Sequence, residues 1–252
     1  MAVDVCHPPS VGGASLLQMR EIFAWSGALA VTGIALACSN ASSAPSDPAA
    51  VLRQAAQAMA GLHSVSADVK FGPGITVEGL ALSSATSKIQ LPGESDSVFK
   101  VKQGDFLLDL RVVTTGGHVY LRLPFASFTE VPPAQAKQIP DVTTLFDLHS
   151  GLPAVLSAGK DTRYLGMEQV EGTDSDKVNT TYSADQLGQL LGGIKPAGDV
   201  KATIWVGRSD HYVRKVILSG PLVEAGKVVQ VEVDLRAFNQ AVVIATPSLS
   251  PA

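Results

Sequence analysis

Hydrophobic residues recur along this chain with two different periods, and each change of period marks a predicted helix or strand. From Val51 to Leu62 the apolar residues fall at helical spacing, after an Asp47–Pro48 pair that is typical of a helix start. From Val65 to Phe71 the period is two, with apolar residues on one face and Ser, Asp and Lys on the other. The sequence therefore predicts an amphipathic helix that ends near Gly61, followed by a strand with one buried side.

The two-residue period returns through the rest of the chain and predicts a large sheet. Glycine turns at 116–117 and 207–210 predict two hairpins. The further predicted strands cover residues 75–82, 88–91, 98–102, 105–114, 118–124, 164–170, 178–182, 201–220 and 227–236. Successive strands are separated by short turns, so we expect them to be mostly antiparallel.

Two more helices are predicted between these strands. The first runs from Leu148 to Leu156 and ends at Gly159, and the second carries an apolar stripe from Leu187 to Ile194. Ser183 and Gln186 before that stripe form a capping box. The order of elements predicts an α+β fold: a large, mostly antiparallel sheet with the helices gathered on one face.

The segment from Arg20 to Cys38 has the layout of a bacterial lipoprotein signal peptide. One basic residue precedes an apolar run from Ile22 to Ala37, which is shorter than the roughly 20 residues needed to cross a bilayer. The run ends in Ala35-Leu36-Ala37-Cys38, so Cys38 is predicted to be lipidated and to become the new N-terminus. The alternatives are an ordinary secretory peptide or a disulfide with Cys6, which would lie in the removed part.

These features divide the chain into four predicted segments. Residues 1–37 are the signal peptide, with Met19 as the predicted true start; residues 38–50, rich in Ser, Ala and Pro, are a flexible tether. Residues 51–246 form one domain, and residues 247–252 are a disordered tail. The net charge of −4 comes from interspersed residues without a basic block. Nucleic acid is therefore not an expected partner.

Catalytic and metal-binding motifs are absent from the sequence. The G-x-S-x-G and H-E-x-x-H patterns do not occur, and His63, His118, His149 and His211 are isolated from one another. The acidic group of Glu171, Asp174 and Asp176 lacks the glycine and glutamate of a calcium loop, so a solvated turn is expected there. The sequence predicts no enzyme, no cofactor and no metal site.

The uniformly aliphatic inner face of the sheet allows two interpretations: a solid core under the helices, or a pocket for hydrocarbon. An empty void of roughly 1,000 Å³ would cost more than the stability of a whole domain, so a pocket of that size must hold ligand or water, or collapse. A single ~16-carbon acyl chain would gain about 12 kcal/mol gross on burial. The candidate lining residues are Ile75, Val77, Leu108, Leu110, Val112, Val119, Leu121, Leu152, Leu156, Ile204, Val206, Val231 and Val233.

The chain resembles the mycobacterial LppX/LprA/LprF/LprG lipoprotein family. The resemblance covers essentially all of the chain after Cys38 and is most specific at Asp147 with Gly151-Leu152, and at Ala202–Val206 leading to His211 and Arg214. Leu148 stands where the family usually has proline, and Phe238 stands where it usually has tryptophan. Neither difference affects the expected fold, and the subfamily stays open.

This resemblance implies a strongly curved half-barrel sheet whose concave face and helices enclose an apolar cavity. It implies that acylated lipids or glycolipids bind there and are carried from the inner membrane toward the outer envelope. It further implies a lipid-anchored location at the cell membrane facing the periplasmic or cell-wall space, with the cell wall or secretion as variants. The implied partners are a major-facilitator exporter and host Toll-like receptors. The alternatives are a structural or signalling lipoprotein with a solid core, and a lipid-acting hydrolase.

Overall fold

The computed structural model describes residues 47–249, apart from residues 78, 138, 140 and 191–195 and the side chains of Val77 and Gln189. The predicted signal peptide, with Cys38, and most of the predicted tether lie outside the described residues. Across the described residues, no helix has the length and apolar character needed to cross a membrane.

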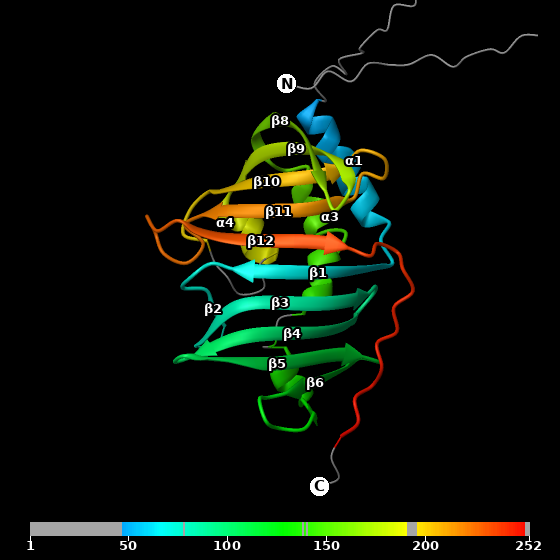
Figure 1. Cartoon of the computed structure of the whole chain (residues 1–252), viewed down its shortest axis with the longest axis vertical. Helices are drawn as coiled ribbons and strands as arrows, with labels where there is room; N and C mark the ends of the chain where they lie inside the picture. Colours follow the sequence, from blue (N-terminus) through cyan, green and yellow to red (C-terminus); the bar gives the residue numbers. More distant parts are fainter. Residues whose placement is uncertain (1–46, 78, 138, 140, 191–195, 250–252) are drawn as a thin grey trace, which may run out of the picture. The chain divides into compact units, whose positions relative to one another are not determined.

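Antiparallel strands build a curved, unclosed sheet that dominates the described region (Figure 1). Eleven strands follow one another in the order β7-β6-β5-β4-β3-β1-β12-β11-β10-β9-β8, and β2 pairs with β3 beside this path. Their bounds are β1 Ser64–Phe71, β2 Thr76–Val77, β3 Leu80–Gln90, β4 Glu94–Gln103, β5 Phe106–Thr115, β6 His118–Arg122, β7 Thr129–Glu130, β8 Lys160–Val170, β9 Thr173–Tyr182, β10 Val200–Gly207, β11 Val213–Gly220 and β12 Val229–Arg236. The first and last thirds of the chain meet where β1 pairs with β12.

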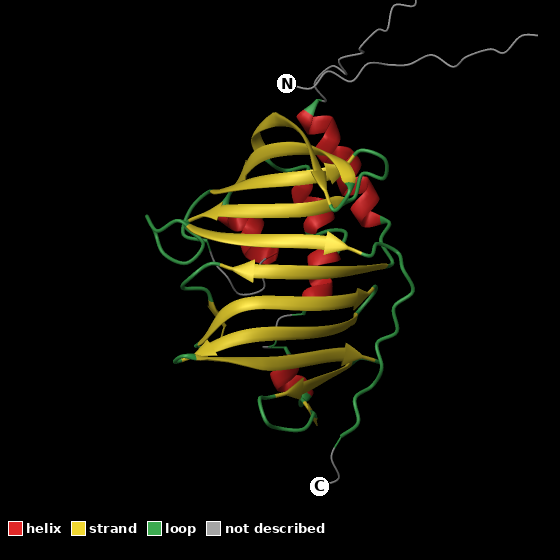
Figure 2. Ribbon diagram, viewed as in Figure 1, coloured by secondary structure: helices red, strands yellow, loops and turns green. Residues whose placement is uncertain are grey.

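The helices lie on one face of this sheet, as Figure 2 shows. They are α1 (Pro48–Ala60), α2 (Pro133–Ala136), the 3-10 helix η1 (Val142–Phe146), α3 (Leu152–Leu156) and α4 (Ala184–Leu190). The predicted α+β class, with helices on the concave side of an antiparallel sheet, is confirmed.

Helix α1 forms where the sequence predicts it. The Asp47 carboxylate accepts a hydrogen bond from the backbone N–H of Ala49 at 3.1 Å, and Pro48 occupies the first helical position. Its apolar stripe is buried against α3, β8 and β10. The capping box of α4 is also confirmed: the Ser183 N–H donates to Gln186 Oε1 at 2.8 Å, and the Gln186 N–H donates to Ser183 Oγ at 3.4 Å.

Strands β3 and β4 are longer than predicted, and one strand prediction before them is wrong. Residues 75–82 do not form one strand, because Gly79, with φ of 79°, lies between β2 and β3 and turns the chain. The segments 88–91 and 98–102 are parts of β3 and β4. Strand β3 has the sequence LALSSATSKIQ. Its many serine, threonine and alanine residues give no clear alternation of apolar and polar side chains, so most of the strand was not predicted.

The prediction of a helix from Leu148 to Leu156 is also wrong for its first half, before Leu152. Asp147 ends η1, and its Oδ1 accepts hydrogen bonds from the N–H groups of His149 (2.9 Å) and Ser150 (2.8 Å). These bonds, together with one from the Ser150 hydroxyl, form a turn that leaves Leu148 54% exposed. Helix α3 starts only after this turn, at Leu152.

The solvated turn expected at the acidic group forms at Glu171, which is exposed between β8 and β9, but not at Asp174 and Asp176. Asp174 and Asp176 belong to β9, and Asp176 is only 8% exposed. It accepts a hydrogen bond from the Tyr164 hydroxyl at 3.0 Å and lies 3.5 Å from the Arg208 guanidinium. A strand with a paired carboxylate therefore replaces the predicted turn beyond Gly172.

The outer face of the sheet carries a ladder of ion pairs across β1, β12 and β11. The Glu232 carboxylate accepts hydrogen bonds from the ammonium groups of Lys70 and Lys215, both at 2.9 Å. Those two hydrogen bonds, first from Lys70 and then from Lys215, lower the pKa of Glu232 to about 2. The indole of Trp205 lies near Lys177 and Lys215, with cation-to-centroid distances of 4.8 and 5.9 Å.

The C-terminal segment after β12 runs along the sheet toward β6 (Figure 1). Ile244 packs with Val113 and Tyr120 in a second, smaller hydrophobic cluster. At the end of the segment Leu249 forms a β-bridge with Phe128. The described part of the predicted tail is thus attached to the sheet; residues 250–252 lie outside the described residues.

Candidate functional site

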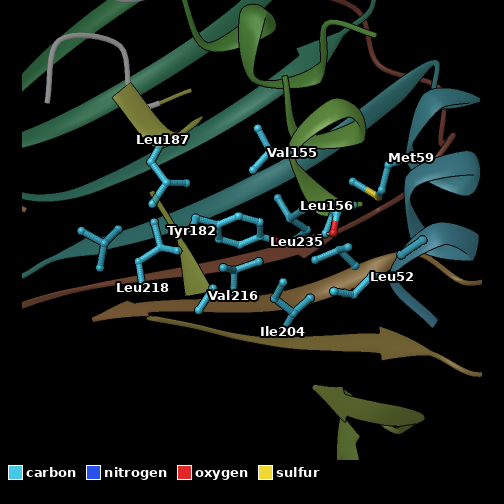
Figure 3. Close-up of a cluster of buried hydrophobic side chains, with 14 of the residues drawn as sticks. Leu52, Met59, Val155, Leu156, Tyr182, Leu187, Ile204, Val216, Leu218 and Leu235 are labelled. Carbon is cyan, nitrogen blue, oxygen red and sulfur yellow. Dashed lines mark hydrogen bonds between the residues drawn. The ribbon is translucent and has the colours of Figure 1, made fainter. Parts of the chain in front are cut away.

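An apolar cavity of about 190 Å³ lies between the concave face of the sheet and the helices. Figure 3 shows part of its wall, with Leu218, Val216, Ile204 and Leu235 from the sheet and Leu187 and Val155 from the helices. The lining includes inward-facing residues of β1, β3, β4, β9, β10, β11 and β12, together with residues of η1, α3 and α4. Of the described lining residues, only Ser87, Asp141, Thr144 and Tyr182 carry polar side-chain groups.

Small side chains at the middle of the sheet create the hollow. Ala67 and Ala85 line the cavity from β1 and β3, and Ser87 lies directly opposite Ala67 in the β1–β3 pairing. Side chains at such positions share one face, so three short side chains meet where larger residues would otherwise fill the space against the helices. The larger aliphatic residues of β10, β11 and β12 form the wall on one side of them.

The polar atoms in this wall are already hydrogen-bonded within the protein. Ser87 Oγ is 2.9 Å from Ser97 Oγ, and the Tyr182 hydroxyl donates to the backbone oxygen of Leu156 at 3.4 Å. Burial raises the pKa of the Tyr182 phenol well above its ordinary value of 10, so this group is neutral. The interior therefore offers a ligand mainly apolar contact.

The cavity opens toward solvent beside η1. Asp141 and Thr144 both line the cavity and are exposed, so the lining reaches the surface at these residues. Asp141 also caps η1, because its Oδ1 accepts hydrogen bonds from the Thr143 N–H (2.9 Å) and hydroxyl (2.8 Å). Since η1 packs on β3 and β4, the mouth faces the part of the sheet that continues into β5.

The thirteen predicted lining residues fall into four groups. Leu152, Ile204, Val231 and Val233 line the cavity. Ile75, Leu156 and Val206 are buried in the surrounding hydrophobic cluster without being among the lining residues. Leu108, Leu110, Val112, Val119 and Leu121 lie on β5 and β6, outside the lining, although the register places them on the concave face. Val77 lies on β2, and its side chain is outside the described residues.

The sequence reasoning missed the lining residues on β1, β3, β4, β9, β11, η1 and α4. Val216 and Leu218 escaped because the alternation of β11 starts after Arg214 and Lys215, and β10 shifts its register at Trp205/Val206. Ala85 and Phe99 could have been found only from the pairing of the strands. Ala85 lies opposite Phe99 on β4 and opposite Val69 on β1. Such register is not encoded in the period of one strand.

Among the described residues that line the cavity there is no histidine, cysteine or lysine. Of the histidines, His118 binds Glu130 at 2.7 Å and His211 lies in the β10–β11 turn with φ of 58°. Among residues 47–249, apart from the gaps given above, no group of three or more His, Cys, Asp or Glu side chains is arranged to hold a metal ion. The geometry of the cavity supports binding of an apolar group.

Comparison with known proteins places the chain among lipoproteins. A model of the LppX_LprAFG lipoprotein family matches residues 47–244. The chain belongs to this family. Lipoprotein LprA of Mycobacterium tuberculosis H37Rv is 27% identical over 222 residues, which cover 82% of this chain and 88% of LprA. The lipoarabinomannan carrier protein LprG of Mycolicibacterium smegmatis is 28% identical over 112 residues, 43% of this chain and 45% of LprG. That match spans less than half the length of LprG.

Solved structures of the LppX_LprAFG family share the fold. LprF from Mycobacterium bovis superposes with a TM-score of 0.65 at 21% identity, covering 81% of this chain and 99% of LprF. LppX from M. tuberculosis gives 0.58 at 21% identity, with coverage of 79% and 100%. The predicted resemblance to this lipoprotein family is confirmed, and so is the curved antiparallel sheet.

Proposed function

We propose that this lipoprotein binds acylated lipids or glycolipids with their hydrocarbon in the cavity, and carries them from the inner membrane toward the outer envelope. The cavity is the observation that carries this proposal, because its wall is aliphatic and its polar atoms bond to the protein itself. The name of the M. smegmatis relative, a lipoarabinomannan carrier, supports a glycolipid as cargo. No catalytic step is included.

An unfilled cavity of this size is costly, which supports a ligand as its occupant. At about 24 cal/mol per Å³, a dry void of 190 Å³ costs about 5 kcal/mol. Folded domains are stable by only ~5–15 kcal/mol. A solid-core lipoprotein would gain stability by filling this space with larger side chains at Ala67 and Ala85, and this chain does not do so.

The cavity must widen to hold a whole acyl chain. A ~150 Å³ cavity binds benzene, so by proportion 190 Å³ holds about eight carbons. A 16-carbon chain needs about twice this space. The short elements η1 and α4 lie over the hollow and have few contacts with the sheet, whereas α3 packs closely on α1. We propose that η1 and α4 move outward as lipid enters.

The anchoring part of the proposal rests on the sequence before the described domain. We propose that the chain is cut before Cys38, that Cys38 carries the acyl anchor, and that residues 38–50 connect it to the domain on the outer side of the cell membrane. A major-facilitator exporter is the proposed partner in lipid movement. Host Toll-like receptors are proposed to recognise the acylated N-terminus.

Mass spectrometry of bound lipid tests the proposal. The chain purified from a mycobacterial host should yield acylated lipid after solvent extraction, at a substantial fraction of one per protein. A protein that is free of lipid and does not take up a fluorescent fatty acid would leave only an anchored lipoprotein with a solid core. Hydrolysis of an ester substrate that is lost on changing His118, His149 or His211 to alanine would instead favour the hydrolase alternative.

A further inference from the structure

Exposed apolar side chains lie at the start of β5 and just after the end of β6, beyond the mouth of the cavity. Phe106 is 73% exposed, Leu123 is 50% exposed and Phe125 is fully exposed. Leu108, Leu110 and Leu121 beside them are half-buried. We call these six residues the apolar rim: Phe106, Leu108, Leu110, Leu121, Leu123 and Phe125.

The strand register connects the apolar rim to the cavity. Phe99 lines the cavity from β4, and its partner on β5 is Leu110. From there the same face of β5 continues through Leu108, opposite Val101, to Phe106 at the start of the strand. Directly opposite residues share a face, so an unbroken apolar path runs from the cavity wall to the exposed edge.

The basic side chains of these strands lie on the face of the sheet opposite the rim. Lys100 and Lys102 alternate with Phe99 and Val101 along β4, and Arg111 follows Leu110 on β5. The Lys100 ammonium donates to Asp109 at 2.9 Å, and the Arg111 guanidinium donates to Asp96 at 2.7 Å. The side of these strands that carries the rim is therefore apolar.

The apolar rim also lies at the end of the sheet away from the start of the domain. Helix α1, where the domain begins, packs against β8 and β10, whereas β5 and β6 lie near the other end of the strand order (Figure 1). Ten strand spacings of about 4.8 Å separate β8 from β7, or about 48 Å along the sheet. The nine residues from Cys38 to Asp47 span at most about 30 Å. With Cys38 as the proposed anchor, the membrane attachment is at the α1 end of the domain, and the rim lies toward the other end of the strand order.

We propose that the apolar rim inserts into the surface of a phospholipid bilayer and that lipid passes between the bilayer and the cavity along the path from Phe106 to Phe99. This inference rests on the proposed lipid-binding function and adds the surface through which lipid is exchanged. Phe106 and Phe125 provide the insertion, because large apolar side chains at the interface gain most from leaving water.

Depth-dependent quenching tests the contact itself. The full chain carrying Phe125→Trp is reconstituted with vesicles of phosphatidylcholine and phosphatidylglycerol, some with brominated acyl chains. We expect at least threefold more quenching of the added tryptophan than in a Val243→Trp control, because Val243 is 89% exposed and lies outside the rim. Equal quenching of the two variants would overturn the proposal. This measurement needs no fatty-acid binding and stays interpretable if the lipid-binding function fails.

Transfer kinetics test the role of the contact in lipid exchange. The double variant Phe106→Ser/Phe125→Ser should transfer a fluorescent fatty acid to acceptor vesicles at least fivefold more slowly, with unchanged equilibrium affinity. A matched control, Val228→Ser/Val243→Ser, removes two similarly exposed side chains elsewhere and should keep the parent rate. An unchanged rate in the rim variant would overturn the proposal. A second result would also overturn it: the parent chain sediments as a dimer, the rim variant sediments as a monomer, and Phe125→Trp shows no quenching by bromolipid. The rim would then be an interface with a second copy of the chain.

Discussion

A larger side chain at position 85 should fill the cavity, and it should weaken lipid binding without lowering the stability of the fold. Ala85 lies on β3, is 5% exposed, and is flanked across the strands by Val69 and Phe99. Because its side chain faces the cavity, Ala85→Phe would place a phenyl ring into the hollow. Unlike most enlargements in a protein core, this one enters space that the native structure leaves unfilled.

The structure sets the size of both effects. A phenyl ring is the size of the benzene that a ~150 Å³ cavity holds, so the variant would occupy most of the 190 Å³. Removing ~150 Å³ of void is worth about 3.6 kcal/mol at most, and imperfect fit offsets about 1–3 kcal/mol of it. We therefore expect the free energy of unfolding of the lipid-free protein to stay level or rise by up to about 3 kcal/mol. Loss of room for about six carbons, at ~0.8 kcal/mol each, should weaken fatty-acid binding by more than a hundredfold.

Urea unfolding and displacement of a fluorescent fatty acid measure the two effects on delipidated protein. The control is Ala225→Phe, which adds the same ring in an exposed loop and should change neither quantity by much. Ala85→Leu is a smaller version that removes room for three carbons, and it should weaken binding by about fiftyfold. If Ala85→Phe folds and binds fatty acid as tightly as the parent, the cavity is not the binding site and the reasoning is refuted.

Three further predictions concern the size of the cavity, the start of α3 and the outer face of the sheet. In a series of saturated fatty acids, affinity should rise about fourfold per methylene beyond eight carbons and up to sixteen, because the helices move outward; a plateau at about eight carbons would show a rigid cavity. Gly151→Ala should lower the free energy of unfolding by about 1–3 kcal/mol in urea titrations, since the new Cβ would lie 2.6 Å from the backbone N and O of Asp147, and a parent-like midpoint would contradict this. Glu232 has its pKa lowered from 4.5 to about 2, so its stabilising effect is complete above pH 4.5 and is lost as the pH falls toward 2. In Glu232→Gln the free energy of unfolding should therefore fall less between pH 5 and pH 2 than in the parent, and equal slopes would show that the ion pairs contribute nothing.

The hydrophobic pattern predicted those parts of the fold in which local signals and tertiary packing agree. Helix α1 has a cap, a proline and an apolar stripe that all indicate the same element, and strand β12 alternates regularly over its length. The helix expected from Leu148 did not form, because the Asp147 side chain binds the next backbone N–H groups and stabilises a turn. Side-chain competition of this kind is invisible to a periodicity argument.

The cavity was harder to predict than the fold. Period two assigns residues to the concave face, and Leu108, Leu110 and Leu121 do share that face with Phe99 through the strand register. It does not tell which strands lie under the helices, since this depends on strand order and on where η1 and α3 pack. Nor does it reveal that alanine at positions 67 and 85 leaves space, because small residues give only a weak hydrophobic signal.

Nuclear magnetic resonance with a spin-labelled fatty acid tests most directly whether hydrocarbon enters the cavity. A nitroxide in the middle of the acyl chain broadens methyl signals of side chains close to it. We expect the strongest broadening for Ile204, Leu218 and Val231, which line the cavity, and clearly weaker broadening for Val113 and Ile244 in the second cluster. Broadening confined to Val113 and Ile244, or uniform weak broadening, would contradict this prediction.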